Sequence, residues 1–394
     1  MVGELPAARI TPPAFLSDPA LAAILAALPR ARLVGGCVRD SLAGRAVADV
    51  DLATPDEPEA VVAALRGAGL KWAPTGLKHG TVTAISGHRG FEVTTLRRDE
   101  ATDGRHAQVA WTADWRVDAA RRDFTINAMS MLRDGAVFDY FGGIGDLRAG
   151  RVRFVGDPAA RIAEDYLRIL RFFRFHARYC ASAPDGATMQ ALRDGVPGLA
   201  QLSPERVWSE LKRILAAPDP VGSVALMAEL GVLAAVLPEG ATPDRLTRLV
   251  QAGAPPDPLL RLAALLPGDG AALADRLRLS SAERTRLLDL AGPPPRPDAD
   301  GPDLRRALAD TPAEVLSGRS WLAYGAAGEA VRVRLAVIRR PRFPLAGRDA
   351  LALGVPSGPA VGELVREVRA WWMAGGCLAD PAACRAELAR RVRG

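Results

Sequence analysis

The chain has 394 residues, a formal net charge of +6 and a hydrophobic content of 49%. This length exceeds what one hydrophobic core usually supports, so two to four compact units are expected. No apolar run approaches the roughly 18 residues that cross a bilayer. The first residues also lack the basic start and apolar stretch of a signal peptide. We therefore expect a soluble, cytoplasmic protein with no membrane partner.

The use of cysteine and arginine limits further the classes of protein to which the chain could belong. The four cysteines form no C-x-x-C pair, so neither a structural zinc site nor a disulfide scaffold is expected. Almost all basic residues are arginine, because lysine occurs only at Lys71, Lys78 and Lys212. A GC-rich genome produces the same bias, so the charge alone is weak evidence for a nucleic-acid partner.

The N-terminal part alternates short strands and helices. The patterns predict strands at residues 31–35, 47–53, 81–86 and 91–96, and helices at residues 38–43 and 57–68. Residues 86–90 are the predicted turn between the last two strands. Residues 96–114 are polar and lack periodicity, which predicts a long flexible loop. This part is expected to be an α/β domain.

From about residue 158 the pattern changes to helices only. Residues 159–181 carry apolar side chains at three- and four-residue spacing, which predicts one long helix, and residues 204–217 and 221–236 behave likewise. Residues 253–258 predict a loop between helices. The proline-rich residues 292–302 predict a boundary between two helical units.

Two carboxylates stand two residues apart in one predicted strand. Asp49 and Asp51 would therefore point to the same face, where divalent cations relieve their repulsion. Phosphoryl-transfer enzymes hold two Mg²⁺ ions on such a pair. The D-x-D pattern alone is weak, because a solvated strand edge produces it too.

A glycine pair precedes the carboxylates. Gly35 and Gly36 close a predicted strand without side chains, so backbone N–H groups and the start of the next helix can approach a triphosphate. Arg39 projects from the first turn of that helix. Taken together, these residues predict a phosphate cradle beside a metal site, although a tight strand-to-helix turn explains the spacing equally well.

Three ordered motifs resemble one family. They are residues 33–40 (Leu-Val-Gly-Gly-Cys-Val-Arg-Asp) followed by Asp-Val-Asp at 49–51, residues 121–128 (Arg-Arg-Asp-Phe-Thr-Ile-Asn-Ala) and residues 164–171 (Glu-Asp-Tyr-Leu-Arg-Ile-Leu-Arg). The chain resembles the class II CCA-adding enzymes and bacterial poly(A) polymerases of the nucleotidyltransferase superfamily. The resemblance is close over about residues 31–217 and generic beyond them.

The resemblance implies a fold and a domain order. It implies an α/β nucleotidyltransferase head, a small mixed sheet with helices, at residues 1–146, followed by an all-α neck, body and tail. The helical neck, residues 147–217, would recognise the nucleotide base. The helical body would comprise residues 218–297, and the tail, residues 298–394, would bind tRNA.

The resemblance also implies roles for individual residues. Asp49 and Asp51 would be the catalytic residues that bind Mg²⁺, with Glu92 as a possible third carboxylate. The implied nucleotide-binding residues are Gly35, Gly36, Arg39, Arg122, Asp123, Asp165, Arg168, Arg171 and Arg174. Among them, a fixed cation such as Arg122 would stabilise charge that grows on the transferring phosphates.

The base preference can be argued from hydrogen-bonding patterns. Asp165 and Arg168 are three residues apart, so on one helix they share a face. Cytosine and adenine each present an amino donor beside a ring-nitrogen acceptor, which matches a carboxylate beside a guanidinium. Uracil and guanine present the opposite pattern. The pair therefore predicts selection of C and A without a template, although an exposed ion pair has the same spacing.

The motifs predict addition of C, C and A to the 3′ end of tRNA from CTP and ATP, with Mg²⁺ as cofactor and release of pyrophosphate. The alternatives are a poly(A) polymerase, a partial enzyme that adds only CC or only A, and a non-catalytic RNA-binding relative. Residues 80–84 lack the basic Gly-Arg-Arg-Phe-like run of the poly(A) polymerases, and a non-catalytic relative would be expected to lose a metal carboxylate. Residues 96–114 resemble the loop that the family uses to switch from C to A.

Overall fold

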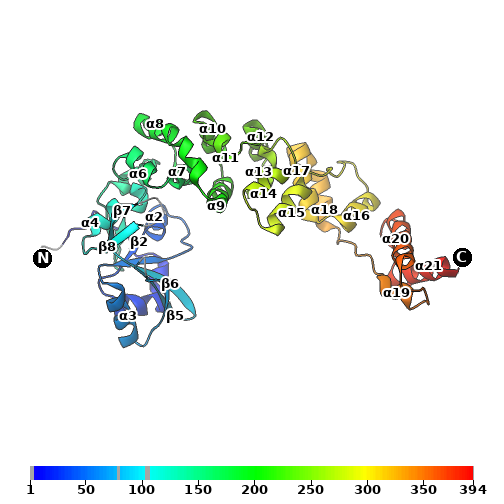
Figure 1. The fold of residues 1–394 in the computed structure, drawn as a ribbon, viewed down its shortest axis with the longest axis horizontal. Coiled ribbons are helices and arrows are strands. Elements are labelled where there is room, and N and C mark those ends of the chain that lie inside the picture. The colour runs from blue at the N-terminus through cyan, green and yellow to red at the C-terminus, as the bar shows by residue number, and fades with distance from the viewer. Residues whose placement is uncertain (1–3, 78–79, 103–106, 394) are drawn as a thin grey trace. The chain divides into compact units, whose positions relative to one another are not determined.

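The computed structural model describes residues 4–77, 80–102 and 107–393. Contacts between residues divide the chain into two compact units, Met1–Val236 and Leu237–Gly394 (Figure 1). The first unit contains the predicted head and neck and begins the predicted body. The finer borders at residues 146, 217 and 297 remain predictions.

The first part of unit 1 is built on an eight-stranded mixed sheet with the strand order β1-β10-β9-β2-β3-β6-β5-β4. The parallel pair is β3 with β6, and the other described pairs in this sheet are antiparallel. The strands are β1 (Ala8–Arg9), β2 (Arg32–Val34), β3 (Asp51–Thr54), β4 (Lys71–Gly76), β5 (Thr81–Ser86), β6 (Arg89–Thr95), β9 (Ser130–Met131) and β10 (Ala136–Phe138). The expected small mixed sheet is confirmed.

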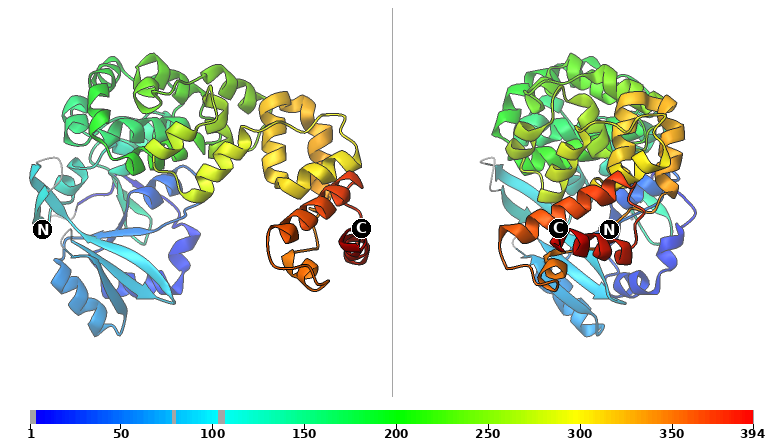
Figure 2. Two further views of the ribbon diagram at one scale, coloured as in Figure 1. Left: turned by 45° about the vertical axis from the view of Figure 1, so that its right-hand side comes forward. Right: turned by 90° about the vertical axis from the view of Figure 1, so that its right-hand side faces the viewer.

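Short helices accompany the sheet. They are η1 (Ala14–Ser17), α1 (Pro19–Ala27), α2 (Gly36–Leu42), α3 (Pro58–Gly67), α4 (Trp115–Ala120), η3 (Thr125–Asn127) and α5 (Gly143–Arg148). Apolar residues of α1 and α3 share one core with alternate residues of the strands, including Phe91 and Val93. The helices of this part lie beside the sheet in the ribbon views of Figure 2. Glu92 lies between those two in β6 and is exposed, so it belongs to the opposite face of the sheet.

Two segments of the head differ from the sequence predictions. The strand predicted at residues 47–53 begins only at Asp51, so Asp49 lies in the irregular segment before β3. The long loop predicted at residues 96–114 is wrong for its described part. There, β7 (Arg97–Thr102) and β8 (Ala107–Trp111) pair as an antiparallel ribbon. Residues 103–106 lie outside the described residues.

Helices complete unit 1. They are α6 (Pro158–Glu164), α7 (Leu167–Tyr179), α8 (Gly186–Asp194), η4 (Val196–Gln201), α9 (Pro204–Leu215), α10 (Val221–Glu229) and α11 (Val232–Val236). The single long helix predicted at residues 159–181 is wrong, because the chain breaks at Asp165, whose φ of −158° and ψ of 105° are extended. The helix predicted at residues 221–236 is likewise divided, at Gly231 with a φ of +78°.

Unit 2 is helical, as predicted. Its helices are α12 (Pro243–Gln251), α13 (Pro258–Leu265), α14 (Ala271–Arg276), α15 (Ser281–Leu290), α16 (Gly301–Asp310), α17 (Ala313–Tyr324), η5 (Gly325–Gly328), α18 (Glu329–Val337), α19 (Gly347–Leu351), α20 (Pro359–Ala374) and α21 (Pro381–Arg393). The loop predicted at residues 253–258 separates α12 from α13. Within the described chain, no helix has the length and apolar character that crossing a membrane requires.

Candidate active site

A cavity of about 540 Å³ lies in unit 1 between the sheet and the helices that follow it. Residues from all three sequence motifs line it. The lining comprises Gly35, Gly36, Arg39, Asp51, Arg121, Arg122, Asp123, Asn127, Asp165, Leu167, Arg168, Arg171, Arg174, Phe175 and Arg206. Of the predicted site residues, only Asp49 and Glu92 are not among them. Arginines outnumber carboxylates in this lining, so the cavity suits an anionic ligand.

The glycine pair forms the turn from β2 into α2. Gly35 has a φ of +69° and a ψ of −124°, a conformation that side chains disfavour, and Gly36 begins the helix. A Cβ atom on Gly35 would lie 3.4 Å from Nη1 of Arg122. The backbone conformation therefore favours glycine here, whereas the approach to Arg122 is an ordinary van der Waals contact.

We expect Gly35→Ala to lower the free energy of unfolding by about 1–3 kcal/mol, because alanine is strained at this φ and ψ. It should also raise KM for the nucleotide, since relief of that strain would move the backbone N–H groups at the start of α2. Urea unfolding and initial rates measure the two effects. Gly67→Ala is a matched control, because a Cβ there meets nothing within 4 Å. Unchanged stability and KM in Gly35→Ala would show that this turn is not constrained.

Three carboxylates gather at the open face of the sheet. Leu52 of β3 pairs with Val93 of β6 in parallel register, so Asp51 lies beside Glu92 on the neighbouring strand. Partial burial raises the pKa of Asp51, and the negative charges of Glu92 and Asp49 raise it further, whereas Arg122 lowers it. This mutual repulsion is what a bound cation would relieve. Asp49 and Glu92 are exposed and therefore accessible to solvent ions.

The donor set fits Mg²⁺ chemically, because carboxylate oxygens are its preferred protein ligands. The described residues nevertheless contain no group of three or more His, Cys, Asp or Glu side chains placed to hold a metal ion together. The metal assignment to Asp49 and Asp51, and the reach of Glu92, therefore stay predictions.

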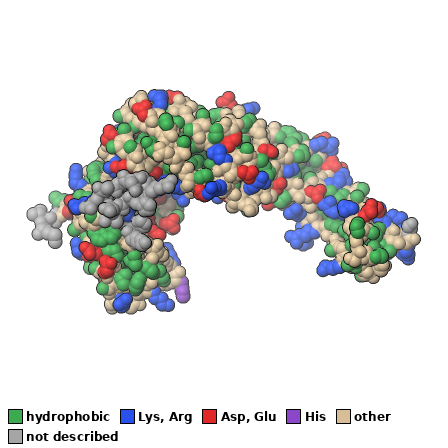
Figure 3. All heavy atoms as spheres, viewed as in Figure 1, with side chains coloured by type: hydrophobic (Ala, Val, Ile, Leu, Met, Phe, Trp, Pro, Cys, Tyr) green, Lys and Arg blue, Asp and Glu red, His purple; other side chains and the backbone are tan. Residues whose placement is uncertain are grey.

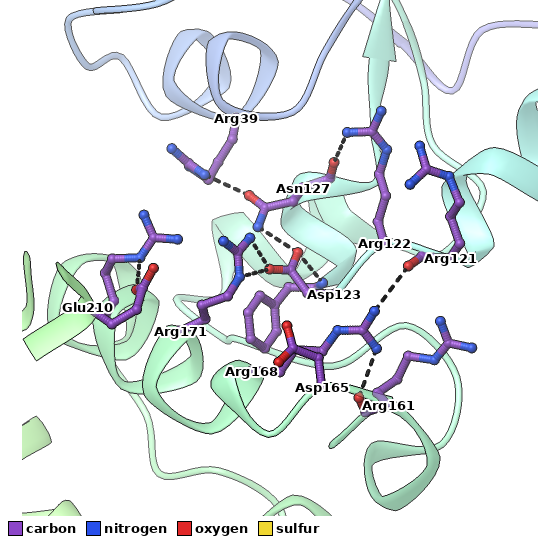
Figure 4. Close-up of polar contacts among 12 residues, drawn as sticks. Arg39, Arg121, Arg122, Asp123, Asn127, Arg161, Asp165, Arg168, Arg171 and Glu210 are labelled. Atoms are coloured by element: carbon purple, nitrogen blue, oxygen red, sulfur yellow. Dashed lines mark hydrogen bonds and ion pairs between the residues drawn. The ribbon is translucent and has the colours of Figure 1, made fainter. Parts of the chain in front are cut away.

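A chain of hydrogen bonds ties α2 to α7 across the cavity floor (Figure 4). Arg39 donates through Nη1 to Oδ1 of Asn127 at 2.6 Å, and Nδ2 of Asn127 donates to Oδ1 of Asp123 at 3.0 Å. Nε of Arg171 donates to Oδ2 of Asp123 at 2.8 Å. Burial alone would raise the pKa of Asp123, but Arg171 and these hydrogen bonds hold it below its ordinary value. Asp123 therefore stays charged and fixes cavity arginines in place, while its implied contact with the nucleotide stays a prediction.

We expect Arg171→Gln to lower the free energy of unfolding at neutral pH by about 2–4 kcal/mol, because Asp123 is left buried and charged without its ion-pair partner. The side chain of Arg171 is 33% exposed, which places the value at the lower end of the range for buried pairs. Since the folded pKa of Asp123 is below its unfolded value, the stability it contributes is present above about pH 4 and is lost as the pH falls through the folded value.

Urea unfolding at pH 7, 5 and 4 tests this pair. The difference in free energy of unfolding between wild type and Arg171→Gln should become smaller as the pH falls. The double variant Asp123→Asn/Arg171→Gln should lose less than the single variant, because no buried charge remains in it. A gap that is constant with pH, or losses that simply add, would contradict the account.

Arg121 and Arg122 both form ion pairs with Asp118 of α4. Their distances to its carboxylate are 2.7 Å and 3.3 Å. Burial raises the pKa of Asp118, but the two arginines outweigh it, so the net shift is downward. Asp118 was not anticipated from the sequence, although the i,i+3 and i,i+4 spacings are the usual signal for such pairs.

The two residues predicted to read the base are arranged differently from the prediction. Asp165 and Arg168 do not share a helix, because Asp165 lies in the break before α7, where its Oδ1 accepts from the backbone N–H of Leu167 at 3.1 Å. Both still line the same cavity. The other oxygen of Asp165 pairs with Arg206 of α9 at 2.7 Å, while Arg168 donates to the carbonyl of Arg161 at 2.8 Å. Each of the two is thus paired with another residue, Asp165 with Arg206 and Arg168 with Glu164, while both line the cavity.

Arg174 continues the cationic lining on the next turn of α7. Its Nε lies 2.9 Å from Oε2 of the buried Glu210, and its guanidinium stands over the ring of Phe175 at 4.4 Å. Burial is the largest influence on this guanidinium and lowers its pKa to about 10, so it remains a cation at neutral pH. Arg171 and Arg174 therefore both present positive charge to the cavity, and their contact with the nucleotide stays a prediction.

Five lining residues were not anticipated: Arg121, Asn127, Leu167, Phe175 and Arg206. The first two lie inside the second motif, so their neighbours in the sequence could have identified them. Phe175 is eight residues after Leu167 on the apolar pattern of α7, and Arg206 lies on a separate helix. No spacing rule connects Arg206 with Asp165.

Comparison with known proteins agrees with this geometry. The family model "Poly A polymerase head domain" matches residues 31–153. A second model, "Probable RNA and SrmB- binding site of polymerase A", matches residues 183–242. The first model includes the two motifs of the head that line the cavity, and the second includes the helices α8 to α11, which follow α7.

Similar curated proteins decide the family. The mitochondrial CCA tRNA nucleotidyltransferase 1 of Danio rerio is 39% identical over 365 residues, which cover 86% of this chain and 83% of that protein. The chain belongs to the CCA tRNA nucleotidyltransferase family. The human mitochondrial protein of the same name is 36% identical and also aligns over 83% of its length. A bacterial CCA-adding enzyme, from Geobacillus stearothermophilus, is 39% identical over 56% of this chain and 54% of its own.

A solved structure supports the fold of this family member. The CCA-adding enzyme of Bacillus stearothermophilus in complex with CTP matches with a TM-score of 0.74 and 27% identity, covering 95% of this chain and 98% of that one. The mixed N-terminal sheet followed by a long all-helical part is therefore the fold of the family.

Proposed function

We propose that this chain adds C, C and A to the 3′ end of tRNA, using CTP and ATP and releasing pyrophosphate. The observation that carries the proposal is one cavity that unites the carboxylate Asp51, the cationic residues of the second motif and the pair Asp165 and Arg168. The first two suit nucleotidyl transfer, and the pair suits selection of C and A. Membership of the family agrees with this activity.

The cationic residues have a common task in this proposal. Arg39, Arg122, Arg171 and Arg174 would hold the triphosphate, together with the backbone of Gly35 and Gly36 at the start of α2. They are fixed before the nucleotide enters, by Asp40, Asp118, Asp123 and Glu210 respectively. Fixed cations need little reorganisation as charge shifts onto the leaving pyrophosphate, so they stabilise the transition state.

Asp49 and Asp51 would hold Mg²⁺, with Glu92 as a neighbour. When bound, the metal lowers the pKa of the attacking 3′ hydroxyl and neutralises charge on the phosphates. The chain itself aligns the substrates: the arginines fix the phosphates, while Asp165 and Arg168 fix the base. The 3′ oxygen of the RNA then attacks the α-phosphate, and the bond to pyrophosphate breaks.

The helical part would bind the RNA, with the tail at residues 298–394 as its predicted tRNA-binding region. Arg305, Arg339, Arg340 and Arg342 line a cavity of about 530 Å³ together with Pro341 and Cys377, and none of these lining residues is acidic. Basic side chains are frequent on the face of this part shown in Figure 3. Such arginines would bind phosphates with an affinity that falls as salt rises.

A poly(A) polymerase is the alternative that shares the motifs, and substrate choice separates the two. With ATP alone, the proposed enzyme should extend a tRNA that ends in CC by one residue and leave an unstructured RNA unextended. Long A tails on the unstructured RNA would favour the polymerase. A tRNA that lacks CCA, supplied with CTP alone, should gain two residues, so that failure in either assay identifies a partial enzyme.

The cytoplasmic location also remains a proposal. It rests on sequence features, whereas the relatives from Danio rerio and human, each aligned over 83% of its length, are named as mitochondrial. Fractionation of the source cells with a matrix marker would decide between the two compartments.

A further inference from the structure

A second cavity lies wholly within the helical unit 2, remote in sequence from every active-site motif. It has a volume of about 320 Å³ and lies between α12, α13 and α17. This is near the lower limit of ligand pockets, roughly 300–1,000 Å³, so it suits one small group rather than a long ligand.

Two arginines supply one side of this pocket. Arg245 and Arg248 are three residues apart on α12 and therefore share a face. Nη1 of Arg245 donates to the carbonyl of Leu266 at 2.8 Å, which fixes the guanidinium, and Arg248 is exposed. In the part of the chain that the structure describes, no ion pair joins either arginine to a carboxylate, and no acidic residue lines the pocket. The charge is therefore available to an anion.

Two aromatic residues supply the other side. Trp321 and Tyr324 are three residues apart at the end of α17. The guanidinium of Arg332 lies 3.4 Å from the centre of the Trp321 ring, and it also donates to the carbonyl of Gly325 at 2.8 Å. Arg332 does not line the pocket. It therefore contacts the indole from outside the pocket, and the part of the Trp321 ring that lines the pocket can still contact a ligand.

We propose that this pocket binds one nucleotide of the RNA substrate, with its phosphate on Arg245 and Arg248 and its base against Trp321 and Tyr324. A nucleoside phosphate carries an anionic phosphate and a flat aromatic base. The arginines on one side of the pocket match the phosphate, and the aromatic rings on the other side match the base. Stacking on aromatic rings tolerates any base, and arginines bind phosphates without regard to sequence. The pocket therefore strengthens RNA binding without selecting a base.

This inference rests on the proposed function, because it takes tRNA as the ligand. The test uses the full chain and a tRNA that lacks CCA. Trp321→Leu should weaken tRNA binding by about 5- to 150-fold, the range for one stacked base. Arg245→Gln/Arg248→Gln should lower the slope of log affinity against log salt by about 2, one for each phosphate-binding arginine. For both variants KM for tRNA should rise while kcat at saturating tRNA is unchanged.

Controls separate the possible failures. Arg284→Gln removes an exposed arginine of the same unit that is paired with Asp275 outside the pocket, and it should bind tRNA as wild type does. If the wild type adds no nucleotides to tRNA, the proposed function fails. If the wild type is active and both pocket variants bind tRNA normally, this inference is overturned. A pocket that binds free AMP or CMP, with tRNA binding unaffected by the variants, would likewise overturn the RNA assignment.

Discussion

Asp51→Asn is expected to lower kcat/KM for nucleotide addition by about 10³-fold or more. A catalytic metal contributes several kcal/mol of transition-state stabilisation, and each 1.36 kcal/mol corresponds to a tenfold change in rate. Asp51 is the carboxylate of the predicted metal pair that lines the cavity, so its loss should affect the metal and the nucleotide together. Single-turnover incorporation of CMP measures the effect.

The same substitution should not destabilise the fold. Burial and the charges of Glu92 and Asp49 raise the pKa of Asp51, so replacing its charge relieves repulsion in the free protein. Activity and stability are therefore expected to change in opposite directions. Asp134→Asn, an exposed carboxylate of the head that pairs with Arg9, is the control and should stay active. Full activity of Asp51→Asn would remove the metal assignment.

Asp165→Ala is expected to relax the choice of base. If its carboxylate accepts the amino hydrogen of cytosine and adenine, its loss should reduce discrimination against UTP and GTP by about 5- to 150-fold, equivalent to one bidentate pairing. Arg206 is paired with Asp165 in the free protein and would then lose its partner, so Arg206→Gln is a useful companion variant.

Competition assays with mixed nucleotides measure this effect. Asp194→Ala, an exposed carboxylate on α8 outside the cavity, should retain the selectivity of the wild type. An Asp165→Ala variant that is slow but still rejects UTP and GTP would show that this residue supports the cavity without reading the base.

The motifs were predictable because each is local. The glycine pair with Arg39, and the second motif with Arg122 and Asp123, occupy short segments whose backbone and side chains form the site directly. That the motifs line one cavity could be expected from the family resemblance, but not from the periodicity of the sequence. The supporting acids Asp118 and Glu210 lie outside the motifs. Asp118 had a signal in its i,i+3 and i,i+4 spacing to Arg121 and Arg122, whereas Glu210 lies on a separate helix from Arg174 and had none.

The errors have physical causes. An apolar pattern continues across Asp165, so periodicity predicts one helix where the carboxylate caps the backbone of Leu167 and starts a second. The β7–β8 ribbon pairs with itself, and β7 is largely a run of polar residues, so that strand lacks the alternation of a half-buried sheet.

Sequencing of the extended 3′ ends tests the central claim most directly. Purified full-length protein is incubated with Mg²⁺ and a tRNA that ends at the discriminator base, with CTP alone, ATP alone or both. The account predicts two added C residues with CTP alone, and termination at C-C-A with both nucleotides. Ends that continue as long A runs, or that contain U or G when all four nucleotides are present, would contradict it.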